Sequence, residues 1–555
     1  MTEVLSFIVL VGVLITVHEL GHFILAKAFG VKVLKFSLGF GPPIASLRRG
    51  ETEYVIAMLP LGGYVRMLGE GDETQKKPAD EGRSFGDQAL WKRILIVLAG
   101  PTMNLLFPLL LYFVVFLGDG QQTPAYVGTV IPGRPADGHL LPGDRVLSID
   151  GNEVRTFYEL GLYVRPAAGR ELEIRVQRGD EEIVTHLTPT LATEQRPLQL
   201  SEDVGRIGVS PLTPLAVIGV VSPSSPAAAA HLRTFDRIVA AGGRPVESFR
   251  DLAAVIDGNR GSMIPVTYLR PTRVTGPLAG VFDLELYEPH VATLTPEPGP
   301  GSGLLRAGLE PSDLYVARVR VGSPEHRAGI LPGDRIVSLD GQPVRLWSQF
   351  VEDLQRQGDL EHEITLRRGD QIVTRRLSIE RDPASLEYGE AIALFTPQIY
   401  NWAPATLPEP VPNPAIFRYA MREAWDRTSE MLELTFMSMV RLVQGRLTTR
   451  TIGGPIEIAS QAGIAASGGP RDFLSFMAFI SLNLGLINLL PIPVLDGGQL
   501  VFLLFEAATR RPVSTRLRTA ASLVGLVMIL GLAVIAFKND IERRWPDLVA
   551  LFEDG

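Results

Sequence analysis

Long apolar segments and polar regions alternate along this chain. A helix needs about 20 mainly apolar residues to cross a bilayer, and four parts of the chain contain such a segment, at 1–30, 92–118, 471–498 and 519–538. The pattern therefore predicts a polytopic α-helical membrane protein with four transmembrane helices. Residues 539–555 form a C-terminal tail beyond the fourth helix.

The loop at 31–91 and the loop before the fourth apolar segment are rich in Lys and Arg. These residues are enriched in cytoplasmic loops of membrane proteins. We therefore expect both loops in the cytoplasm. Both termini and the large polar region before residue 403 are then expected on the other side of the membrane.

The cytoplasmic loop contains a strand-like pattern. Thr52–Leu59 and Gly63–Leu68 flank a turn at Pro60–Gly63, which predicts a β-hairpin. Its apolar content suggests that the hairpin dips toward the membrane, where an unpaired edge could receive a substrate strand. An ordinary cytosolic hairpin would show the same pattern.

The large polar region repeats itself. Leu-Pro-Gly-Asp-Arg occurs at 141–145 and at 331–335, and a weaker copy, Phe-Asp-Arg, lies at 235–237. The period of about 95 residues is that of a domain rather than of a short-repeat solenoid. We expect three inserted α+β domains, at 124–200, 205–297 and 302–382.

The segment at 403–470 begins with a proline-rich linker, from Pro404 to Pro414. Apolar residues such as Phe417, Ala420 and Ala424 then recur at helical spacing. This pattern predicts an amphipathic helix on the membrane surface. Packing of the same helix against the inserted domains is the alternative.

Composition narrows the possible partners and ligands. A formal net charge of −8 argues against a nucleic-acid partner, and the absence of cysteine means that metal ligands must come from His, Asp or Glu. The chain begins Met1-Thr2-Glu3 without the basic start of a signal peptide, so we expect the first apolar segment to stay attached.

The first apolar segment contains His18-Glu19-Leu20-Gly21-His22. On a helix this pattern puts His18 and His22 one turn apart on the same face, where both imidazoles can bind one Zn²⁺. Glu19 is then placed to take a proton from a water molecule at the metal. Ionisable groups at the centre of a bilayer cost about 2.5–3.5 kcal/mol or more, so they persist only when paired or ligated.

A further carboxylate follows the third apolar segment. Pro491 and Pro493 must interrupt the helix, and irregular backbone at membrane depth occurs only where protein or a water-filled cavity surrounds it. Asp496, just past the interruption, can complete a three-ligand catalytic site with the two histidines. In the second apolar segment, Pro101 predicts a kink, which serves either a site nearby or helix packing alone.

With these motifs in their order, the chain resembles the site-2 protease family of intramembrane zinc metalloproteases, in particular its bacterial regulator-of-sigma-E type. The three repeats resemble PDZ domains attached to bacterial proteases, although Phe235 replaces a glycine in the middle copy. The resemblance rests on H-E-L-G-H at 18–22, P-L-G-G-Y-V at 60–65, A-G-P-x-x-N at 99–104, G-G-P-I-x-I-A at 453–459 and N-L-G-L-I-N-L-L-P-I-P-V-L-D-G-G at 483–498.

The resemblance implies roles for particular residues. His18, His22 and Asp496 would bind zinc, and Glu19 would be the general base. The residues that would hold the substrate lie in the predicted hairpin and at the end of the third span, namely Gly62, Gly63, Tyr64, Val65, Asn483 and Asn488.

The resemblance also implies a setting and a substrate class. The protein would lie in the bacterial inner membrane and act in a stress response. It would cleave transmembrane segments of single-span proteins, such as an anti-sigma factor or remnant signal peptides. The extracytoplasmic PDZ-like domains would bind peptide segments and admit only substrates already shortened by an earlier protease. Members of this type usually carry two such domains, whereas this chain has three copies.

Two other classes of protein remain open on the sequence. A catalytically silent PDZ membrane scaffold with a structural zinc would make Glu19 dispensable. A metal-transport protein would use the intramembrane histidines and aspartate as waypoints, but would leave the repeats unexplained. If the protease interpretation holds, Leu20 and Gly21 are expected to tolerate substitution.

Overall fold

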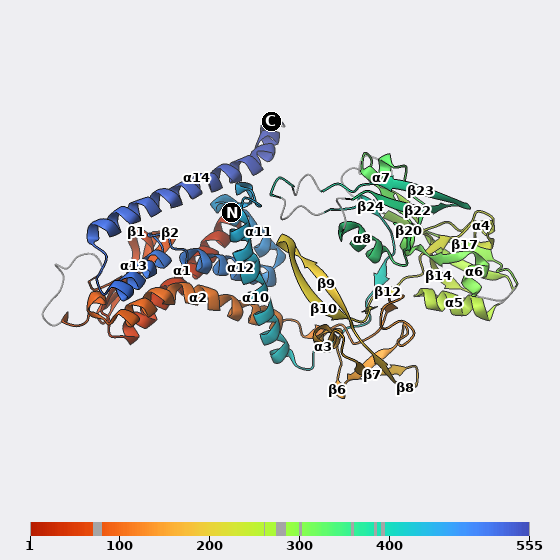
Figure 1. Ribbon diagram of the computed structural model, residues 1–555, viewed down its shortest axis with the longest axis horizontal. Coiled ribbons are helices and arrows are strands. Elements are labelled where there is room, and N and C mark those ends of the chain that lie inside the picture. The colour runs from red at the N-terminus through yellow and green to blue at the C-terminus, as the bar shows by residue number, and fades with distance from the viewer. Residues whose placement is uncertain are drawn as a thin grey trace. The chain divides into compact units, whose positions relative to one another are not determined.

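The computed structural model describes residues 2–553 apart from 70–79, 260, 274–284, 299–301, 357–359, 382–385 and 390–394. The chain divides into two compact units. The first comprises Met1–Gly120, Glu387–Ala391 and Ala415–Gly555, and the second comprises Gln121–Leu386 and Ile392–Pro414. The first unit holds the apolar helices and the second holds the sequence repeats (Figure 1).

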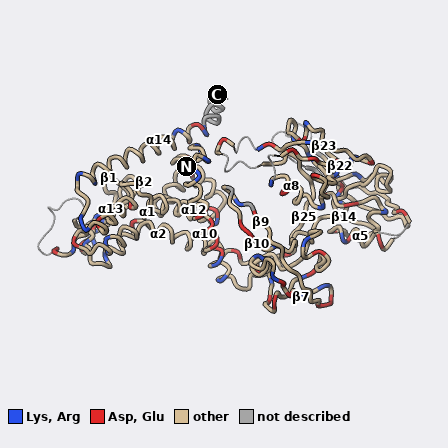
Figure 2. The backbone as a smooth tube through the Cα atoms, viewed as in Figure 1, with Lys and Arg blue, Asp and Glu red and all other residues tan. Residues whose placement is uncertain are grey.

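Helices dominate the first unit. Its α-helices are α1 (Thr2–Ala28), α2 (Leu90–Leu117), α10 (Ile416–Val443), α11 (Pro455–Gly468), α12 (Pro470–Asn488), α13 (Asp496–Thr509) and α14 (Thr515–Glu553). Three described helices are long and apolar enough to cross a membrane: α1, α2 and the part of α14 from Thr515 to Arg544. Figure 2 shows the middle of α14 without charged residues, as a lipid-facing helix requires.

The third apolar segment is divided between two helices. α12 ends at Asn488 and α13 begins at Asp496, so the interruption that Pro491 and Pro493 predict is confirmed. α12 has 19 residues and carries Arg471 and Asp472 in its first turn. It does not count among the three spanning helices found in the described part of the chain.

α2 packs closely against both α1 and α12. A methyl group added at Gly21 of α1 would lie 2.3 Å from the carbonyl oxygen of Ala99. Pro108 has no N–H, so it leaves the carbonyl of Asn104, four residues earlier, without its helical donor. The Ser481 hydroxyl of α12 donates to that carbonyl at 2.9 Å. α2 is therefore the central helix of this unit.

The G-G-P motif begins α11, whose first turn is capped from α14. The Asp540 carboxylate is 1% exposed and accepts hydrogen bonds from the backbone N–H groups of Gly454 at 2.8 Å and Ile456 at 2.9 Å. A carboxylate satisfies the free N–H groups of a helix start and complements the helix dipole. Asp540 thus fixes α14 to α11.

The sheet of the first unit consists of β1 (Val33–Arg49) and β2 (Thr52–Met67). Residues 35–38 of β1 pair with 53–56 of β2 on one side and with 63–66 of β2 on the other. The predicted hairpin is therefore wrong: Thr52–Leu59 and Gly63–Leu68 flank a strand from β1 instead of pairing with each other. Strand pairing depends on contacts between distant residues, which the local turn pattern does not contain.

α10 presents two apolar faces. Ala420 and Ala424 are fully buried, and the helix packs on α2 and α12. Large apolar side chains are exposed on the rest of the helix, among them Phe417, Trp425 and Phe436. Exposed aromatic side chains of this kind are typical of a membrane-contacting helix.

The three repeats in the second unit fold alike. Each has a four-stranded antiparallel sheet, in the orders β6-β5-β7-β8, β15-β14-β16-β17 and β21-β20-β22-β23. The strands are β5 (Arg145–Ile149), β6 (Asn152–Glu153), β7 (Leu172–Arg178), β8 (Glu181–Leu187), β14 (Arg237–Ala241), β15 (Arg244–Pro245), β16 (Ile264–Arg273), β17 (Glu285–Leu294), β20 (Arg335–Leu339), β21 (Gln342–Pro343), β22 (His362–Arg368) and β23 (Gln371–Leu377). Each sheet packs on its own helix, respectively α3 (Phe157–Val164), α5 (Phe249–Gly258) and α8 (Trp347–Arg356).

Shorter elements complete the second unit. The helices are α4 (Pro226–Ala229), α6 (Gly303–Ala307) and α7 (Pro324–Arg327). The paired strands are β3 (Gln121–Gln122) with β26 (Val411–Pro412), β4 (Thr129–Val130) with β11 (Val209–Ser210), β9 (Thr190–Arg196) with β10 (Leu200–Arg206), β12 (Thr213–Pro214) with β25 (Ala405–Thr406), β13 (Ile218–Val220) with β18 (Leu309–Pro311), and β19 (Arg318–Val319) with β24 (Ile399–Tyr400).

The aspartate of the repeated motif has the same partner in all three copies. Asp334 is 1% exposed and forms two hydrogen bonds of 2.7 Å with Arg368 at the end of the third strand of its sheet. The equivalent pairs are Asp144 with Arg178 and Asp236 with Arg270. Leaving such a buried charge without its partner costs about 3–5 kcal/mol. The aspartate of the motif therefore stabilises the fold of each repeat.

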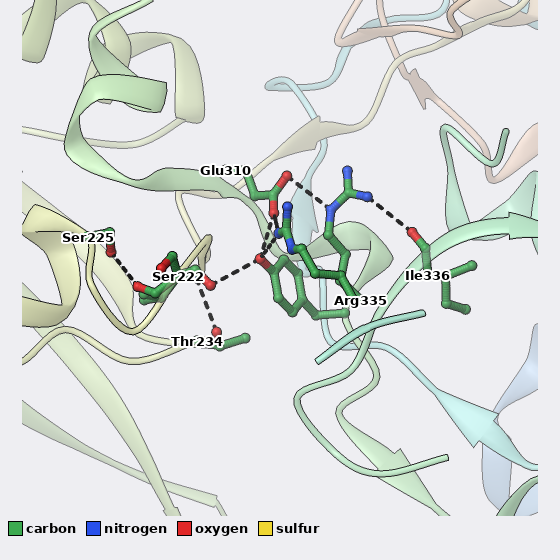
Figure 3. Close-up of polar contacts among 9 residues, drawn as sticks. Ser222, Ser225, Thr234, Glu310, Arg335 and Ile336 are labelled. Atoms are coloured by element: carbon green, nitrogen blue, oxygen red, sulfur yellow. Dashed lines mark hydrogen bonds and ion pairs between the residues drawn. The ribbon is translucent and has the colours of Figure 1, made fainter. Parts of the chain in front are cut away.

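A polar cluster joins the second and third repeats (Figure 3). Glu310 of β18 accepts hydrogen bonds from Tyr315 at 2.6 Å, from Arg335 at 3.0 Å and from Arg367. The Tyr315 ring lies against Gly219, where an added methyl group would be 2.1 Å from the ring. Because Glu310 is on a strand paired with the second repeat and both arginines lie on the third, the cluster fixes the two repeats to each other.

Candidate metal centre

The two histidines of the H-E-x-x-H pattern lie one turn apart on α1. Their Nε2 atoms are 3.3 Å apart, and their ring centroids are 4.9 Å apart. His22 is 8% exposed. Ionisable side chains on an apolar helix persist only where they are paired or ligated.

Asp496 supplies a third ligand atom from the first residue of α13. Its Oδ2 atom lies 3.1 Å from His18 Nε2 and 3.5 Å from His22 Nε2. A tetrahedral zinc ion with bonds of about 2.0–2.1 Å holds its ligand atoms about 3.4 Å apart. The three atoms therefore have the spacing that zinc requires, although residues 22 and 496 are far apart in the sequence.

An ion pair holds α13 against α2. Arg93 Nη2 lies 2.5 Å from Glu506 Oε1, and both side chains are largely buried. Glu506 belongs to the same helix as Asp496, so this pair also restrains the position of the third ligand atom.

Residues of α2 contact both imidazole rings. His22 Nδ1 lies 2.8 Å from the carbonyl oxygen of Ile96. This oxygen accepts a hydrogen bond from the Nδ1–H group, which leaves the Nε2 atom of His22 free for a metal. Gly100 lies between the rings: a methyl group there would be 2.2 Å from His22 Nε2 and 2.8 Å from His18 Cε1. Only glycine leaves room for both rings at this position.

Glu19 lines the same cavity as the three candidate ligand residues. The backbone N–H of Val65 faces the Glu19 carboxylate. The cavity has a volume of about 150 Å³. It is lined by His18, Glu19, His22, Tyr64, Val65, Met67, Phe85, Val97, Asp496 and Gln499. It thus has space for a few water molecules beside a carboxylate and three ligand atoms.

The other predicted site residues lie in different places. Tyr64 and Val65 line the cavity, and Gly63 lies against Glu19, where an added methyl group would be 3.2 Å from Cγ. Gly62 lines a separate apolar cavity of about 460 Å³ between α1 and the sheet. Asn483 donates to the Phe479 carbonyl of its own helix. Neither Asn483 nor Asn488 lines the cavity at the metal ligands.

The structure corrects one expectation about the H-E-L-G-H motif and shows two further residues at the site. Gly21 was expected to tolerate substitution, which is wrong, because an added methyl group would overlap Ala99 of α2. Gly100 and Gln499 contact the site but were not predicted. Gly100 lies inside the motif at 99–104 and Gln499 directly follows the motif at 483–498, so these motifs were the available signal.

A pair of histidines with the spacing of metal ligands and an adjacent glutamate, on a helix long enough to span a membrane, is typical of intramembrane metallopeptidases. Residues 6–532 match the family described as Peptidase family M50. The chain belongs to this family, and it is an intramembrane zinc metalloprotease.

Relatives with assigned names match over nearly their whole length. The regulator of sigma-E protease RseP of Escherichia coli K12 is 28% identical over 98% of this chain and 98% of its own. RseP of Salmonella typhimurium is 28% identical over 97% of this chain and 98% of its own. A relative from Neisseria meningitidis with the provisional name zinc metalloprotease NMA0084 is 28% identical over 98% of this chain and 99% of its own.

Solved structures also match part of the chain. The PDZ domain of an SdrC-like protein from Listeria monocytogenes covers 17% of this chain and 86% of its own length, with 25% identity and a TM-score of 0.13.

Proposed function

We propose that His18, His22 and Asp496 bind the catalytic zinc and that Glu19 is the general base for peptide-bond cleavage. The observation that supports this most strongly is the triangle of ligand atoms, with sides of 3.1, 3.3 and 3.5 Å. Bound zinc supplies Lewis-acid chemistry, which polarises a carbonyl and makes water more acidic. Glu19 lines the same cavity without forming part of the triangle, so its carboxylate is free to accept the proton of the attacking water.

Replacement of a single ligand tests this assignment. Asp496→Ala removes one of three ligand atoms, so we expect the purified protein to lose most of its zinc and its cleavage activity. The control is Asp472→Ala, which removes an exposed carboxylate from α12. Zinc content is measured by atomic emission. Full zinc content in Asp496→Ala would contradict the assignment.

We propose that the substrate binds as an additional strand beside residues 63–67. These residues pair with β1 along one edge, and the backbone of Val65 faces Glu19 along the other. A helix must unwind before a protease can cut it, because its carbonyls are already hydrogen-bonded. A strand edge next to the catalytic residues would hold the unwound segment through main-chain hydrogen bonds.

Val65→Pro tests this strand edge. Proline removes the N–H that faces Glu19, while Val65→Ala keeps it. We expect Val65→Pro to cleave about tenfold more slowly, the effect of losing about one hydrogen bond. Val65→Ala should remain close to wild type, and both variants should keep their zinc. Equal cleavage by the two variants would show that this edge does not hold the substrate.

The proposed setting follows from the helices and the charges. α12 and α13 together would form a third crossing, which gives four spans with α1, α2 and α14. The Lys- and Arg-rich loops support a cytoplasmic position for residues 31–91 in a bacterium, with both termini outside the inner membrane. The exposed aromatic face of α10 would contact the outer lipid boundary.

We propose that the three repeats are PDZ-like domains outside the cytoplasm that bind peptide segments and exclude long substrates. The Glu310 cluster supports a fixed arrangement of the second and third repeats rather than loosely tethered modules. The names of the relatives make an anti-sigma factor one candidate substrate. Remnant signal peptides, which also consist of one apolar segment, are the other.

A further inference from the structure

Asn104 is a fully buried amide in the apolar helix α2, with 0% of its surface exposed. Its side-chain nitrogen lies 3.2 Å from His18 Nδ1. Its side-chain oxygen is buried and has no hydrogen-bond partner among the described residues. A buried polar group without a partner destabilises a protein, so an asparagine here is costly unless it serves the site.

The proton on His18 decides what this contact means. In the proposed zinc site, His18 binds through Nε2, which points toward Asp496. A neutral imidazole that binds metal through Nε2 must carry its proton on Nδ1, and that proton needs an acceptor. For His22 the acceptor is the Ile96 carbonyl at 2.8 Å. For His18, Asn104 is the contact that the structure provides.

The carboxamide can present either atom to His18. A half-turn about its last side-chain bond exchanges oxygen and nitrogen with almost no change in shape. With nitrogen toward His18, Nδ1 accepts a hydrogen bond, and the ring proton sits on Nε2, where it blocks a metal. With oxygen toward His18, Nδ1 donates and the Nε2 lone pair is free. Only the second orientation is compatible with zinc.

We infer, on the basis of the proposed zinc site, that Asn104 is a positioning residue. Its side-chain oxygen accepts a hydrogen bond from the Nδ1–H group of His18 and so directs Nε2 to the metal. Ile96, Gly100 and Asn104 are spaced four residues apart and form one face of α2. Ile96 orients His22, Gly100 makes room for both rings, and Asn104 orients His18.

The position of Asn104 is itself fixed by α12. Its backbone carbonyl has no helical donor, because Pro108 lacks an N–H group. The carbonyl accepts a hydrogen bond from the hydroxyl group of the fully buried Ser481. The same residue therefore contacts α1 through its side chain and α12 through its backbone. α12 leads to the segment that carries Asp496, so Asn104 links the elements that bring the three ligand atoms together.

Zinc binding by full-length variants in detergent tests this inference. Asn104→Ala removes the acceptor, and we expect its zinc affinity to fall about 10–100-fold, measured by competition with a chromophoric chelator. Asn104→Asp keeps an oxygen toward His18, and a carboxylate can only accept, so it should stay within about threefold of the wild type. Leu111→Ala, which truncates another buried side chain of α2, should leave the affinity unchanged.

Two results would overturn the inference. One is a wild-type zinc affinity in Asn104→Ala. The other is a loss in Asn104→Asp as large as that in Asn104→Ala, which would show that the amide matters for packing only. If Asn104→Ala fails to fold, the affinity of Asn104→Asp decides alone. A wild type without zinc would contradict the proposed function instead, so the two failures can be told apart.

Discussion

Glu19→Gln is expected to bind zinc like the wild type and to cleave substrate about a thousandfold more slowly. Glutamine has nearly the same shape as glutamate and keeps the packing of α1, but it cannot accept a proton. General-base catalysis contributes about 10²–10⁴-fold to rates. The ligand triangle does not include Glu19, so zinc should stay in place. The measurement is the cleavage rate of a tagged single-span substrate, with zinc content determined on the same sample.

Glu3→Gln is the matched control for this variant. It makes the same chemical change near the start of α1, away from the cavity, and should cleave normally. Near-normal cleavage by Glu19→Gln would remove the residue from its role as base. It would also restore the scaffold interpretation, in which Glu19 is dispensable.

Gly100→Ala is expected to lose most of its zinc and at least about a hundredfold of its activity. Alanine favours the helix more than glycine does, so α2 itself should not be weakened. The added methyl group would lie 2.2 Å from His22 Nε2 and 2.8 Å from His18 Cε1, so both rings must leave their positions in the ligand triangle. Displacements of about 1 Å at a catalytic site cost about 10²-fold in rate.

The matched control is Gly531→Ala in α14, where nothing lies within 4 Å of the added methyl group. This variant should keep its zinc and its activity. Zinc content and cleavage are measured for both proteins in the same detergent. A Gly100→Ala protein with full zinc content would show that the imidazoles do not occupy the positions described.

The sequence predicted the parts of the site that local pattern determines. His18, Glu19 and His22 follow from helical spacing alone, and the interruption before Asp496 follows from two prolines that cannot continue a helix. The pairing of Asp496 with the histidines followed from donor chemistry and from the family resemblance. The structure agrees with this pairing in the distances between the three ligand atoms.

The sequence could not predict what distant contacts determine. Gly21 looks tolerant within its own helix, and only the crossing with α2 shows that its missing side chain is required. The strand pairing at 33–67 was missed because an intervening strand from β1 separates two segments that look like a hairpin. Asn104 appeared only as part of a motif, since its contact with His18 joins two helices.

α2 therefore has a larger part in the site than its apolar sequence indicates. It contributes no ligand atom to the triangle, yet it contacts both histidines, the helix of Asp496 and α12. Residues that contact metal ligands without binding the metal hold those ligands in position, and their loss weakens a metal site without removing a ligand.

The most direct test of the account is the zinc dependence of cleavage by the purified wild type. The substrate is a tagged single-span protein truncated on its outer side, and the cut is located by mass spectrometry. We predict a cut inside the apolar segment that is lost when a chelator removes the zinc and returns when zinc is restored. Equal cleavage by the zinc-free protein, or a cut only outside the apolar segment, would contradict the account.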